Sequence, residues 1–300
     1  MSVEHRETEP NREDEQVLGV SEKARPTAIT AAFEACRRAK RAAFIPYLAA
    51  GDPDLDTTGA LLDALVAGGA DLIELGVPFS DPIADGPVNQ RAAFRALQSG
   101  TTLSGILRLV ARKREALGVP VVLFTYYNPV HARGVETFAE QAASSGVDGV
   151  LCVDLPPDEA QEELIPALRA QDIDTIFLLA PTSDRDRVRK VARASTGFVY
   201  YVSRTGVTGV RDELAPELSA ELRRVRRRLK LPLAVGFGIS TPDQVAAVGK
   251  LADGVVVGSA LVRLVEELAG RAGLAKAIEE RVRELSAPLH EPKRRLFGRR

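Results

Sequence analysis

Short apolar runs alternate with longer amphipathic segments along most of this sequence. An apolar run bounded by turn-forming residues is typical of a buried strand. By this criterion the strands are predicted at residues 42–49, 71–76, 119–125, 147–153, 175–179, 197–202, 232–235 and 254–257. A segment of helical periodicity follows each of them, so strands and helices alternate along the chain.

The helical segments carry apolar residues three or four positions apart. Leu61, Leu62 and Leu65 form one such face, and Ile29 and Phe33 mark an opening helix before the first strand. The predicted helices cover residues 27–40, 57–67, 89–99, 103–117, 135–144, 157–170, 185–194, 216–229, 242–248 and 261–268, and a last helix ends near residue 285.

This alternation predicts parallel strands, each returned by a helix. Eight such units in about 250 residues are typical of a (β/α)8 TIM barrel, which is the predicted fold of a single domain over residues 28–285. The alternative is an open doubly wound sheet, but the first strand lacks the Gly-x-Gly-x-x-Gly turn that such sheets often carry. The acidic residues 1–27 and the basic residues 286–300 are predicted to be disordered tails.

Composition narrows the classes of function. The 300 residues are 45% hydrophobic and 27% charged, with a formal net charge of −1, which is typical of a soluble globular protein without a nucleic-acid footprint. No apolar run approaches the roughly 20 residues of a membrane span. Cys36 and Cys152 predict no disulfide framework or zinc site and suit a reducing cytoplasm. Three histidines leave little room for a Ser-His-Asp mechanism.

The segment 71–87 concentrates the candidate chemistry. Glu74 lies inside an apolar run, where a charge is costly unless it is paired, protonated or used. Gly and Pro residues follow at once, so Glu74 is predicted near the carboxyl end of a strand, with Asp81 and Asp85 on the next loop. Two carboxyl groups in different environments suit acid–base chemistry. Alternatively, Glu74 binds buried amides and the loop aspartates cap turns.

Barrel enzymes place their chemistry at the carboxyl ends of the strands. Asn128, Asp154 and Arg204 also follow predicted strands. Glycine-rich turns follow the last three strands, at 203–209, 236–240 and 258–259. Glycines let backbone N–H groups approach an anion, so a phosphate-bearing small molecule is the favoured ligand. The loop 204–214 is predicted to be a lid that excludes water; the alternative is a flexible surface loop.

Six segments, in order, resemble the tryptophan synthase alpha chain family: 44–53, 74–87, 126–129, 153–156, 203–209 and 236–240. The resemblance covers roughly residues 28–285. It implies a barrel lyase of tryptophan biosynthesis that cleaves indole-3-glycerol phosphate to indole and glyceraldehyde 3-phosphate. It also implies that Glu74 is the general acid and base and that Asp85 is the second catalytic carboxylate.

The resemblance also implies the substrate contacts. Tyr200 matches an active-site tyrosine, Tyr47 and Tyr126 match the aromatic pocket, and Thr208 matches a lid threonine that contacts the catalytic aspartate. The implied phosphate-binding residues are Gly209, Gly236, Gly238, Gly258 and Ser259. Two features depart from the family pattern: the hydroxyl of Tyr47, where phenylalanine is common, and the segment 88–90, Val-Asn-Gln.

The family's partner is a PLP-dependent beta chain that takes up indole through a tunnel, in an alpha2-beta2 heterotetramer. The alpha chain itself uses no cofactor. Two other functions are weighed beside this one. A phosphate-binding barrel that isomerises or epimerises a sugar phosphate would share the late glycine turns, but not Glu74 and Asp85 beside Tyr47, Phe124 and Tyr126. A non-catalytic regulatory subunit would not need both carboxylates.

Overall fold

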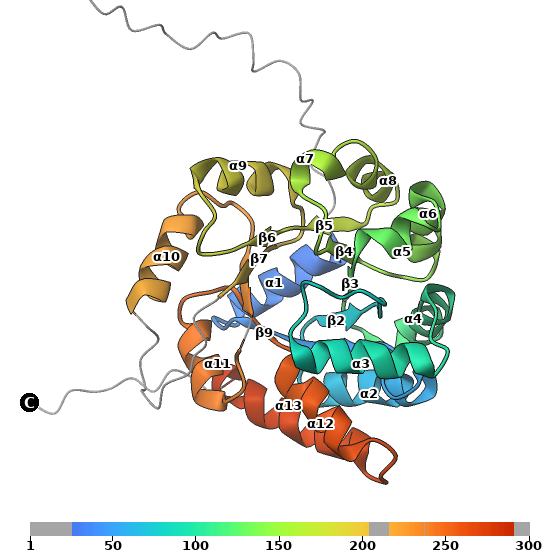
Figure 1. Ribbon diagram of the computed structural model, residues 1–300. Coiled ribbons are helices and arrows are strands. Elements are labelled where there is room, and N and C mark those ends of the chain that lie inside the picture. The colour runs from blue at the N-terminus through green and yellow to red at the C-terminus, as the bar shows by residue number, and fades with distance from the viewer. Residues whose placement is uncertain (1–25, 204–215, 237, 291–300) are drawn as a thin grey trace, which may run out of the picture.

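A ring of parallel strands forms the centre of the molecule, and helices surround it (Figure 1). The computed structural model describes residues 26–203, 216–236 and 238–290. Within these residues the strands are β1 Ala43–Ala49, β2 Ile73–Gly76, β3 Val121–Thr125, β4 Gly149–Cys152, β5 Asp174–Ile176, β6 Leu178–Leu179, β7 Val199–Val202, β8 Leu233–Gly236 and β9 Gly254–Val257.

The helices follow the predicted order with a few changes. They are α1 Ala28–Arg38, α2 Leu55–Ala67, α3 Pro87–Gln98, α4 Leu103–Leu117, α5 Tyr127–His131, α6 Val135–Ser144, α7 Pro157–Ala160, α8 Leu164–Ala170, α9 Arg185–Ala194, α10 Pro216–Arg226, α11 Pro242–Gly249, α12 Ser259–Leu268 and α13 Leu274–His290.

The sheet closes into a barrel. Its strand order is β5-β4-β3-β2-β1-β9-β8-β7-β6, and the paired neighbours are parallel. The two ends of this order, β5 and β6, are consecutive in the chain on either side of Phe177. The predicted fifth strand, 175–179, is therefore divided where it changes partners from β4 to β7. Because the carbonyl of Phe177 accepts a hydrogen bond from the backbone N–H of Tyr200 at 3.1 Å, the ladder continues, which confirms the (β/α)8 barrel.

The last helix is longer than predicted. It was expected to end near residue 285, with a tail at 286–300, but α13 continues to His290. The reason is burial: Leu289 and Ser286 are both buried, and the Ser286 hydroxyl donates a hydrogen bond to the carbonyl of Gly68 at 3.2 Å. The barrel domain thus extends five residues beyond the predicted boundary at 285. Residues 1–25 and 291–300 lie outside the described residues.

Two other helix predictions need correction. The predicted helix 157–170 is two helices, α7 and α8. The segment after β3 was expected to be a loop that includes His131, but it forms the short helix α5. Pro129 is the third residue of α5, where its missing N–H costs nothing because first-turn N–H groups lack partners within the helix. Asp154 accepts a hydrogen bond from the backbone N–H of Tyr127 at 2.8 Å, which fixes the start of α5.

Two apolar layers hold the barrel, one inside the ring of strands and one between strands and helices. The opening helix α1 closes the amino-terminal end of the barrel interior, where the rings of Phe33 and Phe198 lie 5.4 Å apart (Figure 1). Side chains of β2 alternate between the layers. Ile73 and Leu75 pack in the outer layer, so Glu74 between them faces the interior.

A repeated hydrogen bond ties the strands in pairs at the amino-terminal end of the barrel. A side chain that precedes the second strand of each pair accepts a hydrogen bond from a backbone N–H of the first strand. The pairs are Asp71 with Phe44 at 2.8 Å, Asp148 with Val121 at 2.8 Å, Thr196 with Thr175 at 2.9 Å and Asp253 with Leu233 at 3.0 Å.

Each aspartate of this repeat also pairs with an arginine. The pairs are Arg41 with Asp71, Arg114 with Asp148, and Arg226 with Asp253. The Arg41–Asp71 pair is bidentate, with N–O distances of 2.6 and 2.7 Å, and both side chains are largely buried. Bidentate pairs that also bind backbone are among the stronger polar contacts in proteins. This end of the barrel therefore serves stability and lies opposite the carboxyl ends of the strands.

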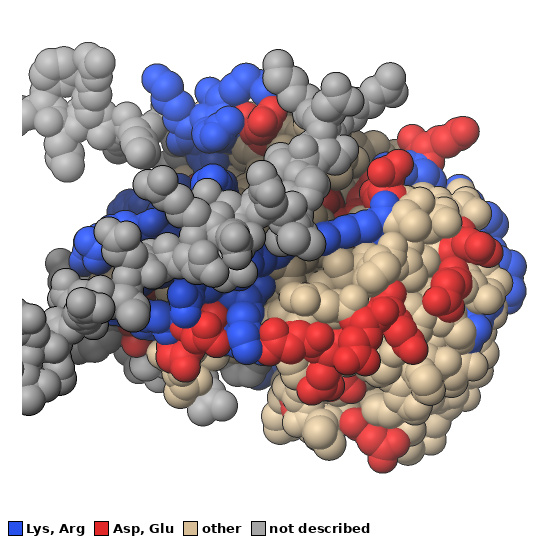
Figure 2. Space-filling model, turned by 90° about the horizontal axis from the view of Figure 1, so that it is seen from above, with Lys and Arg blue, Asp and Glu red and all other residues tan. Residues whose placement is uncertain are grey.

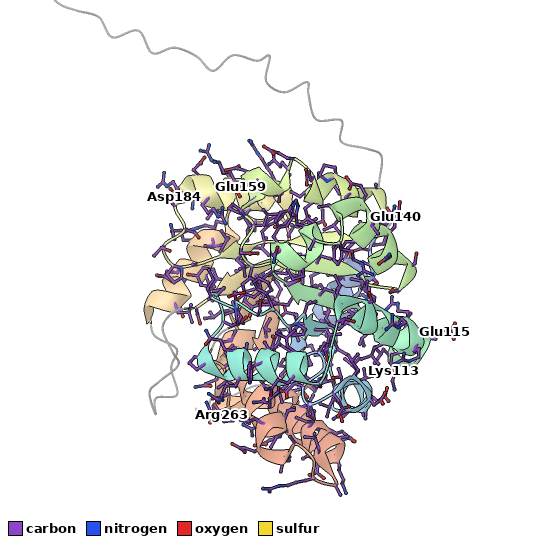
Figure 3. The ribbon with its side chains drawn as sticks, turned by 45° about the vertical axis from the view of Figure 1, so that its right-hand side comes forward. Lys113, Glu115, Glu140, Glu159, Asp184 and Arg263 are labelled. Atoms are coloured by element: carbon purple, nitrogen blue, oxygen red, sulfur yellow. The ribbon has the colours of Figure 1, made fainter. Side chains whose placement is uncertain are left out.

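The outer surface carries charges of both signs. Figure 2 shows acidic side chains beside basic ones on one face. Lys190 of α9 pairs with Asp158 of α7 at 2.7 Å. Lys113, Glu115 and Glu140 lie on the outside of the helical ring (Figure 3). Among the described helices, none is long and apolar enough for a membrane crossing.

Replacing Asp71 by alanine should destabilise the fold, because Arg41 and the N–H of Phe44 lose their acceptor. We expect the free energy of unfolding in urea to fall by about 2–4 kcal/mol. The matched control is Asp63→Ala, whose exposed carboxylate pairs with Lys113 alone among the described residues and should change stability by less than about 1 kcal/mol. Equal effects in the two variants would contradict a stabilising role for the repeat.

Candidate active site

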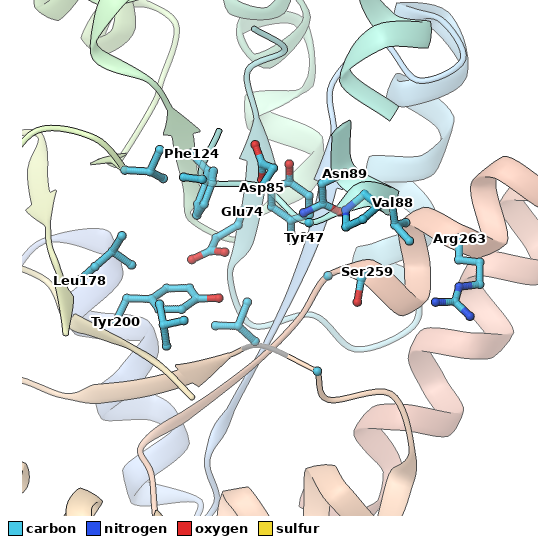
Figure 4. A pocket seen from close by; sticks show the side chains of 18 residues that line it. Tyr47, Glu74, Asp85, Val88, Asn89, Phe124, Leu178, Tyr200, Ser259 and Arg263 are labelled. Carbon is cyan, nitrogen blue, oxygen red and sulfur yellow. The ribbon is translucent and has the colours of Figure 1, made fainter. Parts of the chain in front are cut away.

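A cavity of about 390 Å³ lies at the carboxyl ends of the strands (Figure 4). Its lining comes from nearly every strand and from the loops after β2, β8 and β9. The described residues that line it are Tyr47, Glu74, Ala84, Asp85, Gly86, Pro87, Val88, Asn89, Phe124, Val153, Leu178, Tyr200, Val202, Gly238, Val256, Gly258, Ser259 and Arg263. The cavity therefore contains both predicted catalytic carboxyl groups.

Glu74 is the buried acid of this cavity. It stands opposite Tyr47 of β1 and Val122 of β3 in the sheet register, and its side chain is 1% exposed. Within the described residues, neither carboxyl oxygen has a hydrogen-bond partner. The alternative of a structural carboxylate held by buried amides is therefore not what the structure shows. Figure 4 shows the carboxyl group and the ring of Tyr200 pointing into the same space.

Burial decides the protonation of Glu74. Removal from water disfavours the charged form and raises the pKa of Glu74 from 4.5 to about 8. At neutral pH this side chain is mostly the uncharged acid, ready to donate a proton. Burial also raises the pKa of the neighbouring Tyr47 and Tyr200 well above 10, so both hydroxyls remain protonated.

Two glycines leave the space that the rings of Tyr47 and Tyr200 occupy. A Cβ atom on Gly76 would lie 2.2 Å from the Tyr47 hydroxyl oxygen, and one on Gly236 would lie 2.1 Å from that of Tyr200. Any larger residue would displace the rings. Gly236 was expected to bind phosphate, but it faces Tyr200 and is not among the described residues that line the cavity. The sequence showed only that Gly236 belongs to a glycine-rich turn. The close approach of the Tyr200 ring to Gly236 depends on the pairing of β7 with β8.

Asp85 lies on the loop between β2 and α3 and is held by Tyr126. The Tyr126 hydroxyl donates to Asp85 Oδ2 at 3.0 Å and accepts from the backbone N–H of Ala84 at 3.0 Å. Burial raises the pKa of Asp85, while hydrogen bonds from Tyr126 and Asn89 lower it. Tyr126 was expected to touch substrate. In the structure its hydroxyl contacts Asp85, and Tyr126 lines the small space beside Asp85 but is not among the described residues that line the main cavity.

Charged pairs fix the helices that frame the loop. Glu266 of α12 accepts hydrogen bonds from Arg91 at 2.7 Å and from Arg95 at 2.8 Å, both on α3. Arg95 also forms a bidentate pair with Asp52, on the turn after β1. Hydrogen bonding to Arg91 is the largest cause that lowers the pKa of Glu266, to about 2. The start of α3, which carries cavity residues, is thereby tied to α12.

The other side of the cavity has the features of an anion site. Gly258 and Ser259 line the cavity at the start of α12, where first-turn N–H groups lack partners within the helix, and Gly238 lies nearby with φ +76°. Arg263, one turn further along α12, also lines the cavity (Figure 4). Sequence reasoning missed Arg263, although its spacing of four from Ser259 places both on one helix face.

The remaining predicted residues are placed differently. Thr208, Gly209 and Arg204 lie outside the described residues, as does the whole lid predicted at 204–214. Asp154 binds the start of α5 and is not among the described cavity residues. In the described part of the chain, no group of three or more His, Cys, Asp or Glu side chains is placed to hold a metal ion.

Asn89 is the second cavity residue that the sequence did not assign. It lies in the first turn of α3, and its Oδ1 atom is buried without a hydrogen-bond partner in the described residues. The sequence marked 88–90 as a departure from the family pattern but did not say where Asn89 would point.

The fold and the site together define a (β/α)8-barrel enzyme with a buried carboxylic acid in the cavity at the carboxyl ends of its strands. Comparison with known proteins agrees. The family model described as "Tryptophan synthase alpha chain" matches residues 33–290. The tryptophan synthase alpha chain of Solibacter usitatus is 52% identical over 259 residues, covering 86% of this chain and 97% of the relative. That of Citrifermentans bemidjiense is 55% identical over 238 residues, covering 79% and 89%.

Solved structures show the same relationship. Tryptophan synthase subunit alpha from Legionella pneumophila superposes with a TM-score of 0.81 at 36% identity, covering 88% of this chain and 98% of that one. A chain of tryptophan synthase from M. tuberculosis gives 0.79 at 36% identity, covering 89% and 100%. This chain belongs to the tryptophan synthase alpha chain family, a family of lyases of tryptophan biosynthesis.

The raised pKa of Glu74 predicts a pH-dependent stability. Between pH 4.5 and about 8 the unfolded chain has released this proton and the folded chain retains it, so the wild-type free energy of unfolding falls as pH rises. Glu74→Gln has no such proton. We expect it to unfold with a free energy about 3 kcal/mol above wild type at pH 7 and near wild type at pH 4.

Urea unfolding at a series of pH values measures this difference. Glu115→Gln, an exposed change on α4, is the control and should follow the wild-type curve. A constant difference between wild type and Glu74→Gln from pH 4 to pH 8 would show that Glu74 ionises normally in the folded protein.

Proposed function

We propose that this chain cleaves indole-3-glycerol phosphate to indole and glyceraldehyde 3-phosphate by a retro-aldol reaction in which Glu74 transfers the protons. The observation that carries this proposal is the buried carboxyl group of Glu74, which has no hydrogen-bond partner among the described residues and lines the cavity of a member of the tryptophan synthase alpha chain family. A barrel that isomerises sugar phosphates would need polar groups for several hydroxyls, whereas Tyr47, Phe124 and Leu178 make much of this cavity apolar.

The first step needs an acid. Indole leaves poorly from its C3 carbon until that carbon is protonated, and Glu74, with a pKa near 8, is a protonated acid at neutral pH. Glu74 delivers its proton to C3, and the ring becomes cationic. The resulting carboxylate then takes the proton of the glycerol hydroxyl next to the breaking bond. The carbon–carbon bond cleaves, its electrons return to the ring, the hydroxyl carbon becomes an aldehyde, and Glu74 is again protonated.

Asp85 supports the cationic ring. Its carboxylate accepts a hydrogen bond from the ring N–H and stabilises the positive charge that forms after C3 protonation. The hydrogen bonds from Tyr126 and Asn89 oppose the effect of burial on the pKa of Asp85 and favour its charged form. The surroundings of the two carboxyl groups thus differ, because Glu74 has no hydrogen-bond partner among the described residues, whereas Asp85 has donors that favour its charged form.

The phosphate belongs at the start of α12. Backbone N–H groups near Gly258 and Ser259, the turn at Gly238 and the cation of Arg263 suit a dianion, and Gly209 is retained as a proposed contact. The phosphate does not react, so its binding energy holds the glycerol chain in position. The indole ring would be enclosed by Tyr200 and by the rings of Tyr47 and Phe124, whose centroids lie 5.4 Å apart in an edge-to-face arrangement. Thr208 would close over Asp85.

The name of the family implies a beta-chain partner, and we propose an alpha2-beta2 assembly in the cytoplasm. Exposed apolar side chains support a docking surface beside the site. Ile83, on the loop that carries Asp85, is 87% exposed, and Phe94 of α3 is 62% exposed. Indole must leave near this loop. The alpha chain needs no cofactor for proton transfer between these groups, and PLP belongs to the beta chain.

The catalytic roles are tested by indole formation from indole-3-glycerol phosphate. We expect Glu74→Gln and Asp85→Asn each to lower kcat by at least about 10²-fold, because each removes a proton donor or a charge. Glu115→Gln on the outer surface should retain wild-type activity. Near-normal turnover by Glu74→Gln would remove Glu74 from the mechanism. Isomerisation of an aminated sugar phosphate by the wild-type chain, without indole release, would favour the other class of barrel enzyme.

The assembly is tested by mixing. The purified chain and a tryptophan synthase beta chain should elute together with the mass of two copies of each, and the mixture should form indole faster than the alpha chain alone. Phe94→Glu should weaken this complex, because it places a charge on the proposed apolar surface. If the two chains elute separately at micromolar concentration, the proposed assembly is wrong.

A further inference from the structure

Asn89 lines the active-site cavity and carries a buried polar atom that has no hydrogen-bond partner among the described residues. It lies in the first turn of α3, and it lines both the main cavity and the small space beside Asp85 and Tyr126. Its Oδ1 atom is buried, and the described residues supply no donor for it. Figure 4 shows Asn89 beside Asp85 and Tyr47 at one side of the cavity.

The neighbouring Asp85 determines whether the nitrogen or the oxygen of the Asn89 side-chain amide lacks a hydrogen-bond partner. The side chain of Asn89 lies close enough to Asp85 to lower the pKa of that carboxyl group. A hydrogen bond that lowers the pKa of a carboxyl group is donated to it, so the amide nitrogen of Asn89 is the group that faces Asp85. The amide oxygen is then the acceptor without a partner.

A carbonyl oxygen without a hydrogen-bond partner, such as Asn89 Oδ1, is energetically unfavourable among apolar side chains. The cavity residues near Asn89 include Val88, Tyr47 and Phe124, whose surfaces are mostly apolar. A buried carbonyl that gains no hydrogen bond has lost its contact with water without compensation. A leucine of similar size would fill the same place without this cost. The atom is therefore explained by a ligand that brings a donor to it.

We propose that Asn89 Oδ1 accepts a hydrogen bond from the ring N–H of the substrate, shared with Asp85, and so makes the site selective for bicyclic rings that carry this donor. This inference rests on the proposed function. A ring N–H has one hydrogen and no acceptor, and one hydrogen shared by two oxygens is a common three-centre arrangement. The bond strengthens as the ring becomes cationic, so Asn89 assists the same step as Asp85.

The test compares indole with benzothiophene, which has nearly the same shape but no N–H. Dissociation constants are measured for the full chain by calorimetry. In wild type, indole should bind more tightly than benzothiophene. Asn89→Leu should reduce this preference about threefold to tenfold, chiefly by weakening indole binding. Val88→Ala, a neighbouring apolar change, should alter both affinities alike and leave their ratio unchanged.

A second pair of variants separates direct contact from an effect through Asp85. In an Asp85→Ala background, Asn89→Leu should still lower the preference for indole, because the amide oxygen acts without the carboxylate. An unchanged preference in that background would show that Asn89 only positions Asp85 and would overturn the proposal. Equal weakening of both ligands by Asn89→Leu would overturn it too. Asn89→Ala repeats the comparison if the leucine variant folds poorly.

The same samples keep this inference distinct from the proposed reaction. Wild-type chain that forms no indole from indole-3-glycerol phosphate would refute the reaction. The ratio of indole to benzothiophene affinity concerns only the ring contact, and its loss in Asn89→Leu would still support the contact.

Discussion

The unpaired burial of Glu74 is the constraint on which the site depends. Strand β2 directs this side chain into the barrel, between neighbouring strands that offer it aromatic rings and no hydrogen-bond partner among the described residues. Burial therefore favours the uncharged acid, which is the form that can protonate a carbon at neutral pH. Gly76 and Gly236 leave room for the tyrosine rings that keep the site apolar. The same burial that suits the proposed role of Glu74 as an acid lowers the stability of the fold at neutral pH.

The barrel separates the residues that hold it together from those that line its cavity. At its amino-terminal end, paired aspartates and arginines tie successive strands, and α1 fills the opening. At the carboxyl end, the same strands present carboxyl groups, rings and glycine turns to one cavity. Glu266 joins α3 to α12 through two arginines, so the two sides of the cavity, one beside Asp85 and one at Ser259, are held in a fixed relation. Because the stabilising ion pairs lie at the opposite end of the barrel, the cavity can contain a destabilising buried carboxyl group such as Glu74 while the fold remains stable.

The alternation of apolar runs and helical segments was enough to predict the barrel, and one acidic residue in such a run was enough to predict the position of Glu74. Properties that depend on neighbouring strands were beyond the sequence. The sequence predicted Gly236 as part of a phosphate-binding turn, but it could not show that the ring of Tyr200 packs against this glycine. It predicted Tyr126 as a pocket residue, but it could not show that the Tyr126 hydroxyl donates a hydrogen bond to Asp85. Arg263 and Asn89 enter the cavity from helices, and helical periodicity does not say which polar residue faces a neighbouring cavity.

The most direct test of this account is the ionisation of Glu74 itself. The carboxyl carbons of glutamate are labelled with 13C, and their chemical shifts are followed by NMR from pH 4 to pH 10, with Glu74→Gln used to assign the signal. The account predicts that the signal of Glu74 titrates with a pKa of about 8. A midpoint near 4.5 would contradict it, because Glu74 would then be a carboxylate at neutral pH with no proton to give.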